Sequence, residues 1–311
     1  MRAAVLTELG ATPVVADFRE PEAAEGQVVL DMLAGGLNPF DLRVSSGALP
    51  DRAPPVPSVV GSEGVGRTAD GRRVYFARSI RPWGSIAERD LTEEAALVDV
   101  PDTVGDAQAL AFGISGTAAW GALTRRGRLQ PGERVLVLGA SGIVGTIAVQ
   151  AAKLLGAAHV TAAARSDEGL ARARERGADA TVKLEGEDLT QAFLDAAGGP
   201  IDLVIDPLWG APASAALEAL AERGRLVHLG QSAGAEATFT SVNLRFKELS
   251  ILGYTNFMST PQQQADALHA MWKHAAAGEL VADVETFPLD DAPAAWERQA
   301  GSPRAKLVII P

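Results

Sequence analysis

The sequence predicts an α/β protein made of a β-rich domain and a doubly wound parallel-sheet domain. Three observations predict it. The first part of the chain, to about residue 110, carries short apolar or alternating runs separated by Gly and Pro clusters, which is typical of strands and turns. From Asp106 onward, runs of strand length alternate with stretches of helical periodicity, which indicates a parallel sheet covered on both faces. A glycine-rich turn joins the first of these strands to the helix that follows it.

The β-rich part is predicted to hold strands at Arg2–Leu6, Gln27–Leu33, Gly64–Thr68 and Arg73–Phe76. After a long helix at Pro261–Ala277, the tail Ala305–Ile310 is again predicted to be a strand. If that tail rejoins the first strands, the β-rich domain is discontinuous in sequence. We therefore expect one domain from residues 1–110 and 257–311, and a second from residues 111–256.

The second domain is predicted to alternate strands and helices. The predicted strands are Val135–Leu138, His159–Ala164, Ala180–Lys183, Ile201–Asp206, Arg225–Leu229 and Leu249–Gly253. The predicted helices are Ile143–Leu155, Glu168–Arg176, Leu189–Ala197 and Pro212–Arg223. Gly156, Gly177 and Gly224 follow three of these helices, where a left-handed cap is useful.

Gly139, Gly142 and Gly145 recur at three-residue spacing between the first predicted strand and helix. Free backbone N–H groups at a helix start, together with the helix dipole, suit a pyrophosphate. The glycines allow a tight turn and a close approach of backbone to phosphate. The spacing alone is a weak signal, but a strand before it, a helix after it and a second strand one βαβ unit later predict a dinucleotide site.

The end of the second predicted strand indicates which dinucleotide binds. An NAD site usually places an acidic residue there for the ribose 2′-hydroxyl. Here Arg165 and Ser166 occupy that place, and a guanidinium beside a hydroxyl suits a 2′-phosphate. Asp167 and Glu168 are expected to begin the next helix, where negative charge is favoured. The sequence therefore predicts NADPH; the alternative is that Arg165 is a solvated surface charge.

Composition limits the class of protein. The 311 residues are 47% hydrophobic and 22% charged, enough for two globular domains, and no apolar stretch is long enough to cross a bilayer. The net charge of −11 argues against nucleic acid as a partner, and no secretion signal is apparent. There is no cysteine, which excludes disulfides and thiolate metal sites. We expect a cytoplasmic enzyme without membrane partners.

Several short motifs together resemble one family over essentially the full length. They are Asn38-Pro-Phe-Asp41, Gly61-Ser-Glu-Gly-Val-Gly66, Gly113-Ile-Ser-Gly-Thr-Ala118, the Gly139–Gly145 loop, Asp206-Pro-Leu-Trp-Gly210 and Gly224-Arg-Leu-Val-His-Leu-Gly230. The chain is thereby identified as resembling the zinc-independent quinone oxidoreductase branch of the medium-chain dehydrogenases/reductases. The resemblance implies a GroES-like β-rich domain joined to a Rossmann domain, with the active site in the cleft between them.

The chain departs from the zinc-dependent relatives at their ligand positions. Those relatives carry a Cys near Asn38 and a His where this chain has Ser62. The four histidines, His159, His228, His269 and His274, are expected to be packing or surface residues, because a catalytic zinc needs about three protein ligands. We therefore expect no metal site.

Without a metal, hydride transfer is easier to a conjugated acceptor, which already delocalises the incoming electrons. The resemblance implies NADPH-dependent reduction of a quinone or an α,β-unsaturated carbonyl. Two alternatives stay open: reduction of another unsaturated small molecule, such as an enoyl thioester, an imine or a biosynthetic intermediate, and a non-catalytic NADPH-binding role.

Two residues are candidates for the chemistry. Asn38 matches a family Asn near the nicotinamide and substrate, and its amide can donate to an oxyanion; the alternative is a turn cap before proline. Tyr254 is a candidate proton donor, with packing as its alternative. Phe40 and Trp83 are candidate walls of the substrate pocket, or simply structural aromatics. A lysine before the last strand, here Lys306, recurs in relatives and is a further candidate.

The remaining candidates are cofactor-binding residues. Thr117 matches a family Thr beside the nicotinamide ribose or phosphates, with a helix-start role as its alternative. The predicted cofactor contacts are Asn38, Thr117, Ser141, Gly142, Ile143, Val144, Arg165, Ser166, Leu229, Gly230, Gln231, Gly253 and Tyr254. Relatives commonly pair through the edge of the parallel sheet, so the resemblance also implies a homodimer formed at Leu249–Gly253.

Overall fold

We describe the protein from a computed structural model that covers every residue, Met1–Pro311. The chain forms two compact units. Unit 1 comprises Met1–Ser115 and Thr260–Pro311, and unit 2 comprises Gly116–Ser259. These units correspond to the two predicted domains, whose expected boundaries are 110/111 and 256/257. No helix has both the length and the apolar character needed to cross a membrane.

Unit 1 is built on two sheets whose strands are mostly antiparallel. The smaller sheet has the order β2-β1-β4, with β1 at Arg2–Leu6, β2 at Val14–Asp17 and β4 at Ser58–Val59. The larger sheet has the order β15-β16-β3-β5-β6-β8, and β7 also pairs with β3. Its strands are β3 (Gln27–Leu37), β5 (Glu63–Arg67), β6 (Arg73–Phe76), β7 (Arg89–Glu93), β8 (Val98–Asp99), β15 (Val284–Pro288) and β16 (Lys306–Ile310). The helices of this unit are α1 (Pro39–Ser45), α2 (Asp106–Ala111), α9 (Pro261–Ala276) and α10 (Ala292–Ala300).

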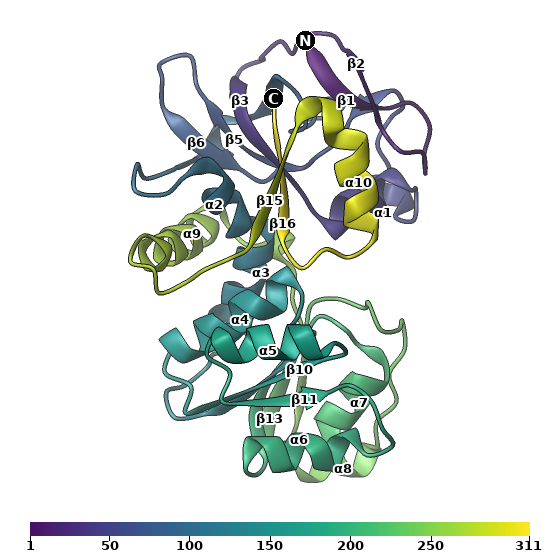
Figure 1. Cartoon of the computed structure of the whole chain (residues 1–311), viewed down its shortest axis with the longest axis vertical. Coiled ribbons are helices and arrows are strands. Elements are labelled where there is room, and N and C mark those ends of the chain that lie inside the picture. The colour runs from purple at the N-terminus through teal and green to yellow at the C-terminus, as the bar shows by residue number, and fades with distance from the viewer. The chain divides into compact units, whose positions relative to one another are not determined.

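The C-terminal strand lies in the same sheet as the early strands. β16 pairs antiparallel with β3, with Leu307 opposite Leu37, and Figure 1 shows the yellow tail beside the purple β3. Leu37, Leu307 and Ile309 are buried in one apolar cluster with Trp296 of α10. Burial of these side chains supplies the main stabilisation that holds the two segments of unit 1 together.

β3 continues to Leu37, whereas the sequence analysis ends it at Leu33; that prediction is wrong. Gly35 and Gly36 lie inside the strand, where they allow other groups to approach the backbone closely. A Cβ on Gly35 would lie 2.4 Å from the Ser85 carbonyl oxygen, and one on Gly36 would lie 2.9 Å from Cε of Lys306. Glycine inside a strand often marks such a close approach.

Unit 2 contains a six-stranded parallel sheet with the order β11-β10-β9-β12-β13-β14. Its strands are β9 (Arg134–Leu138), β10 (His159–Ala164), β11 (Ala180–Lys183), β12 (Ile201–Asp206), β13 (Leu220–His228) and β14 (Ser250–Gly253). The connecting helices are α4 (Ile143–Leu154), α5 (Asp167–Glu175), α6 (Leu189–Ala197), α7 (Gly210–Glu218) and α8 (Ser241–Phe246). This strand order is that of the Rossmann doubly wound fold, so the predicted fold class is confirmed.

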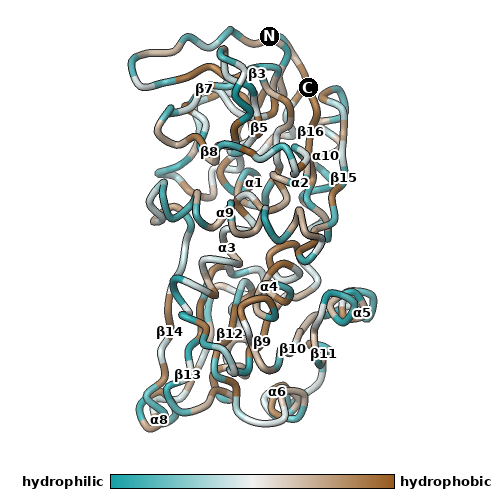
Figure 2. The backbone as a smooth tube through the Cα atoms, turned by 90° about the vertical axis from the view of Figure 1, so that its left-hand side faces the viewer, coloured by the Kyte–Doolittle hydropathy of each residue, from teal (hydrophilic) through white to brown (hydrophobic).

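The strand order reverses between β9 and β12, and a doubly wound sheet binds ligands at that point, beyond the carboxyl ends of its strands. The central strands are apolar, and Leu136, Val137 and Val204 are fully buried. Figure 2 shows hydrophobic colour along β9 and β12, mainly hydrophilic colour on α5, and both colours on α6 and α8. The loop after β9 therefore sits at the position where this fold binds a dinucleotide.

One helix and one strand differ from prediction. The helix predicted at Pro212–Arg223 ends at Glu218, and β13 begins at Leu220, earlier than the predicted Arg225. Leu220 is fully buried and pairs with Ile201 of β12, so packing on the sheet overrides a periodicity that also suits a helix. Gly156 and Gly177 adopt positive φ after their helices, but Gly224 lies within β13 and the positive φ falls on Arg223.

Candidate cofactor and active site

The glycine loop after β9 forms a cradle at the start of α4. Gly139 has a φ of +63°, and Gly142 is the N-cap of the helix. A Cβ on Gly145 would lie 2.3 Å from the Gly139 carbonyl oxygen, so only glycine fits there. The first N–H groups of a helix have no intrahelical partner, and here they belong to Ile143 and Val144, which are half-buried. Backbone donors at this loop suit a pyrophosphate.

Arg165 lies at the end of β10, next to β9 in the sheet, on the same edge as the glycine loop. Its side chain is exposed and makes no hydrogen bond or ion pair in the structure. Ser166 is the N-cap of α5, and its hydroxyl accepts a hydrogen bond from the Gly169 N–H at 3.1 Å. A Cβ on Gly169 would lie 2.4 Å from Cβ of Ser141, so the start of α5 lies against the glycine loop.

The two acids that follow Arg165 begin α5, as predicted. Asp167 forms an ion pair with Lys183 at 3.1 Å, and Glu168 pairs with Arg172 at 3.4 Å. Their charges are therefore partly balanced by cations other than Arg165. The guanidinium is left as an unpaired positive group at the edge where a dinucleotide ribose is expected.

Leu229, Gly230 and Gln231 follow β13 at the carboxyl edge of the sheet. The Leu229 N–H donates to the Asp206 carbonyl oxygen at 2.9 Å, which ties this segment to the end of β12. A Cβ on Gly230 would lie 2.6 Å from the Pro207 carbonyl oxygen, so this glycine permits a close backbone approach. Gly253 ends the neighbouring strand β14 at the same edge.

Tyr254 and Thr117 come together within unit 2. The Tyr254 hydroxyl donates to the Thr117 carbonyl oxygen at 3.3 Å, and the Asn256 amide donates to Thr117 Oγ1 at 2.9 Å. Arg125 places its guanidinium 5.1 Å from the centre of the Tyr254 ring. The Tyr254 hydroxyl proton is thus directed at a backbone carbonyl. Its role as a proton donor stays a prediction.

Asn38 lies in unit 1, between β3 and α1, and only 2% of it is exposed. Its N–H donates to Oδ2 of Asp41 at 2.8 Å, which fixes the start of α1. Its side-chain amide donates to Oε1 of Glu63 at 2.9 Å and, more weakly, to Oδ2 of Asp41 at 3.4 Å. Its Oδ1 accepts a hydrogen bond from Nζ of Lys306 at 2.8 Å. Every polar atom of the carboxamide therefore has a partner in the protein.

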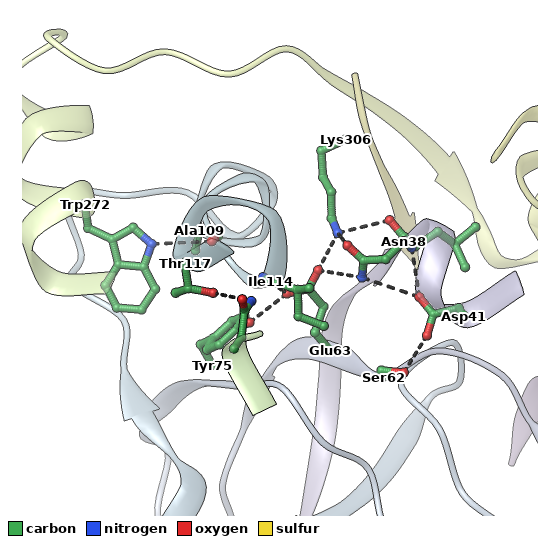
Figure 3. Close-up of polar contacts among 12 residues, drawn as sticks. Asn38, Asp41, Ser62, Glu63, Tyr75, Ala109, Ile114, Thr117, Trp272 and Lys306 are labelled. Carbon is green, nitrogen blue, oxygen red and sulfur yellow. Dashed lines mark hydrogen bonds and ion pairs between the residues drawn. The ribbon is translucent and has the colours of Figure 1, made fainter. Parts of the chain in front are cut away.

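Glu63, the first residue of β5, is fully buried and accepts hydrogen bonds on both carboxylate oxygens. Oε1 accepts from the Asn38 amide and from Nζ of Lys306, with which it forms a buried ion pair. Oε2 accepts from the Tyr75 hydroxyl and from the Ile114 N–H, each at 2.7 Å. We call the set Asn38, Asp41, Ser62, Glu63, Tyr75 and Lys306 the Glu63 cluster; Figure 3 shows it.

Two glycines make room for this carboxylate. A Cβ on Gly113 would lie 2.1 Å from Oε2 of Glu63, and a Cβ on Gly36 would lie 3.1 Å from Oε1. The backbone around Glu63 therefore approaches its carboxylate closely. A buried charge is tolerated when it is paired and hydrogen-bonded, and here Lys306 provides the opposite charge.

Burial shifts two acids of the cluster. It raises the pKa of the Asp41 carboxyl, although the hydrogen bond from the Ser62 hydroxyl to Oδ1 opposes the shift. Burial, followed by the nearby charge of Glu63, raises the pKa of the Tyr75 hydroxyl well above its ordinary value. Tyr75 therefore stays protonated and acts as a hydrogen-bond donor to Glu63.

The two predicted aromatic walls lie in different surroundings. Phe40 is half-buried on α1, two residues after Asn38 in the sequence. Trp83 packs with Arg19 instead: its indole N–H donates to the Arg19 carbonyl oxygen at 3.3 Å, and the Arg19 guanidinium lies 5.1 Å from its ring. Trp83 is not part of the Glu63 cluster, and its role as a wall of the substrate pocket stays a prediction.

The histidines have local partners. Nε2 of His159 lies 2.9 Å from the Ala196 carbonyl oxygen, and Nδ1 of His228 lies 3.2 Å from Oδ2 of Asp206. His274 contacts Glu279 at 2.7 Å, and His269 stacks edge-on against Trp272. The structure contains no group of three or more His, Cys, Asp or Glu side chains that could hold a metal ion.

Sequence reasoning missed most of the Glu63 cluster. It named Asn38 and considered Lys306, but Glu63, Ser62 and Tyr75 were not among the candidates. A usable signal was present: a lysine opening a strand of apolar residues, and a glutamate between glycines, are both expensive to bury without partners.

The model of the family described as "Zinc-binding dehydrogenase" matches residues 144–273. Human quinone oxidoreductase is 31% identical over 289 residues, which cover 87% of this chain and 85% of that protein. A phenolphthiocerol/phthiocerol polyketide synthase component from Mycobacterium tuberculosis is 31% identical over 91% of this chain, but the chain spans only 13% of that much longer protein.

Among solved structures, the quinone oxidoreductase from Thermus thermophilus, described also in complex with NADPH, is 34% identical. The structural match covers both chains completely with a TM-score of 0.83. The sequence similarity and the shared fold extend over nearly the whole chain. The protein therefore belongs to the quinone oxidoreductase branch of the medium-chain dehydrogenase/reductase family.

Proposed function

We propose that this protein is an NADPH-dependent reductase that passes hydride to a quinone or an α,β-unsaturated carbonyl without a metal ion. The observation that carries the proposal is the cradle at the start of α4, where a Cβ on Gly145 would meet backbone at 2.3 Å. Glycine at this position lets α4 pack closely against the loop, and the backbone donors at the helix start suit a pyrophosphate. When bound, the cofactor supplies the hydride.

The residues of unit 2 divide the work of binding. Ser141, Gly142, Ile143 and Val144 offer the loop and helix-start backbone to the pyrophosphate. Arg165, exposed and without a protein partner, is available to the 2′-phosphate. Leu229, Gly230 and Gln231, with Gly253 and Tyr254, lie at the carboxyl edge of β13 and β14, where this fold orients the rest of a dinucleotide.

Asn38 is our candidate for the group that contacts the acceptor. One of its amide hydrogens is held firmly by Glu63 at 2.9 Å, while the other is held weakly by Asp41 at 3.4 Å. The weakly held hydrogen is the one available to an acceptor oxygen that gains charge as hydride arrives. In a quinone or enone, conjugation spreads that charge, so a single neutral donor is sufficient.

A metal-independent reaction agrees with the side chains available. The sequence has no cysteine, and Ser62 bonds to Asp41 in the Glu63 cluster. A catalytic zinc needs about three protein ligands. The histidines lie apart on β10, β13 and α9, each with a local contact.

The test is cofactor oxidation by purified protein with NADPH or NADH and a panel of acceptors: a simple quinone, an enone and an enoyl thioester. We expect oxidation of NADPH with quinone or enone, slower oxidation of NADH, and less than stoichiometric metal by elemental analysis. Binding of NADPH without turnover of any acceptor contradicts the proposal and supports the non-catalytic alternative. Stoichiometric bound zinc contradicts the metal-independent mechanism.

An enoyl thioester is the second candidate acceptor. The similarity to part of a polyketide synthase subunit favours it. Turnover of the thioester with no turnover of quinone or simple enone would select this candidate over the first.

A further inference from the structure

The ion pair between Lys306 and Glu63 is unusual because both side chains are buried, with 1% and 0% of their side chains exposed. The two residues lie far apart in the sequence, on β16 and β5. Removing two charges from water is costly, and a buried ion pair is often no more stable than an apolar pair of the same size. A buried ion pair of this kind can instead serve to fix the orientation of a neighbouring side chain.

The neighbour that both members contact is Asn38. Nζ of Lys306 donates to Asn38 Oδ1 at 2.8 Å, and Oε1 of Glu63 accepts from Asn38 Nδ2 at 2.9 Å. An ammonium can only donate hydrogen bonds and a carboxylate can only accept them. Lys306 therefore pairs only with the oxygen of the carboxamide, and Glu63 only with its NH2 group. Figure 3 shows the amide lying between the two charged groups.

Rotating the Asn38 carboxamide by half a turn would reverse both contacts. The amide hydrogens would then face the ammonium, and Oδ1 would face the carboxylate, giving two repulsive contacts in a buried site. The ion pair therefore permits one orientation of the amide. In that orientation the remaining amide hydrogen points towards Asp41, through its weak 3.4 Å contact.

We propose that Lys306 and Glu63 are positioning residues for the reaction, which fix the carboxamide of Asn38 so that the N–H held only weakly by Asp41 is the one available to the acceptor oxygen. This rests on the proposed function, because it assumes that Asn38 contacts the acceptor. Lys306 also donates to the Leu37 carbonyl oxygen at 3.0 Å, so the same ammonium holds the end of β3 from which Asn38 follows.

Glu63 is itself held by two further donors. The Tyr75 hydroxyl and the Ile114 N–H donate to its Oε2, and the backbone at Gly36 and Gly113 approaches the carboxylate closely. The raised pKa of the Tyr75 hydroxyl, caused by burial and by Glu63, keeps it a donor in the working pH range. The carboxylate is thus a fixed reference point for the amide.

The experiment uses the paired variant Glu63→Gln/Lys306→Met, which removes both buried charges together and leaves neither ion unpaired. Gln can accept or donate, so it no longer selects one orientation of Asn38. We expect kcat to fall by about tenfold or more, while KM for NADPH and for the acceptor changes by less than about threefold, since misorientation of a reacting group costs rate more than binding.

Two further variants separate positioning from general damage. Val308→Ala, on the same strand and fully buried, removes apolar contacts of β16 without touching Asn38 and should keep kcat while lowering the unfolding midpoint. In an Asn38→Ala background, the paired variant should change kcat by less than about twofold, because the group being positioned is gone.

The outcomes are distinct. If Asn38→Ala leaves turnover unchanged, the role proposed for Asn38 fails, and this inference fails with it. If Asn38→Ala lowers kcat but the paired variant does not, or if the two effects multiply fully, the positioning inference alone is overturned. Should the paired variant not fold, Tyr75→Phe removes a hydrogen bond to Oε2 of Glu63 while keeping both buried charges, and it should lower kcat with little change in either KM; an unchanged kcat would overturn the inference.

Discussion

Replacing Arg165 by alanine tests how the protein chooses its cofactor. Arg165 is exposed at the end of β10 and has no ion-pair partner, so its loss leaves no buried charge and breaks no contact within the protein. The variant should fold with the stability of the parent. Any change in cofactor affinity then reports directly on the missing guanidinium.

The expected magnitude follows from that exposure. A hydrogen bond between charged groups contributes about 1.5–3 kcal/mol when it is shielded from water. At an exposed site, solvent and salt reduce this to about 1–2 kcal/mol, which corresponds to about a 5- to 30-fold loss of NADPH affinity. NADH has no 2′-phosphate, so its affinity should change by less than about twofold.

The assay is a titration of parent and variant with NADPH and with NADH, by calorimetry or by quenching of protein fluorescence, at low and at high salt. The NADPH difference should shrink as salt is added, because screening weakens a charge at the surface. Arg174, exposed in the last turn of α5, provides a matched control: Arg174→Ala removes a charge from the helix that follows Arg165, at the end away from β10. Equal weakening of NADPH and NADH by Arg165→Ala would refute the assignment.

Three further predictions concern stability, the cofactor cradle and assembly. Burial raises the pKa of the Asp90 carboxyl from 3.8 to about 7, so the folded state holds this proton more tightly than the unfolded chain, and the free energy of unfolding falls as the pH rises between these values. Urea unfolding of the parent should show a loss of about 2–3 kcal/mol between about pH 5 and about pH 8, and Asp90→Asn should remove that loss. An unchanged pH dependence in the variant would contradict this. Gly145→Ala places a Cβ 2.3 Å from backbone and should weaken NADPH binding by at least about tenfold, or ~1.4 kcal/mol, with unaltered binding as the contrary result. We also predict a homodimer formed through β14, an edge strand of the parallel sheet, so sedimentation should give about twice the chain mass of 32.3 kDa, and a single-chain mass would exclude it.

Sequence reasoning succeeded where the signal is local. The glycine loop can be recognised from one short stretch of sequence, because a strand, three glycines and an amphipathic helix follow one another directly. The strands of unit 2 are similarly marked by apolar runs between turns, and five of the six predicted strands lie within one residue of the observed ends. Local propensity and tertiary packing agree in these segments.

Sequence reasoning failed where the register of paired strands brings together side chains that lie far apart in the chain. Lys306 meets Glu63 only because β16 pairs with β3, with Leu307 opposite Leu37, and β3 pairs with β5, with Gly36 opposite Glu63. No spacing in the sequence encodes that alignment across 243 residues. The end of α7 was predicted wrongly for a related reason: Leu220 continues the helical pattern of the sequence, but it pairs with Ile201 in the sheet.

The central claim is that hydride moves from the dinucleotide bound at the α4 cradle to a conjugated carbon without a metal. The most direct measurement uses NADPH deuterated on the transferring position of its nicotinamide ring, an enone acceptor and protein treated with a strong chelator. The account predicts that the reduced product carries deuterium on its β-carbon, and that chelator-treated protein forms this product as fast as untreated protein does. A product without the label, or activity that disappears with the chelator and returns with zinc, would contradict it.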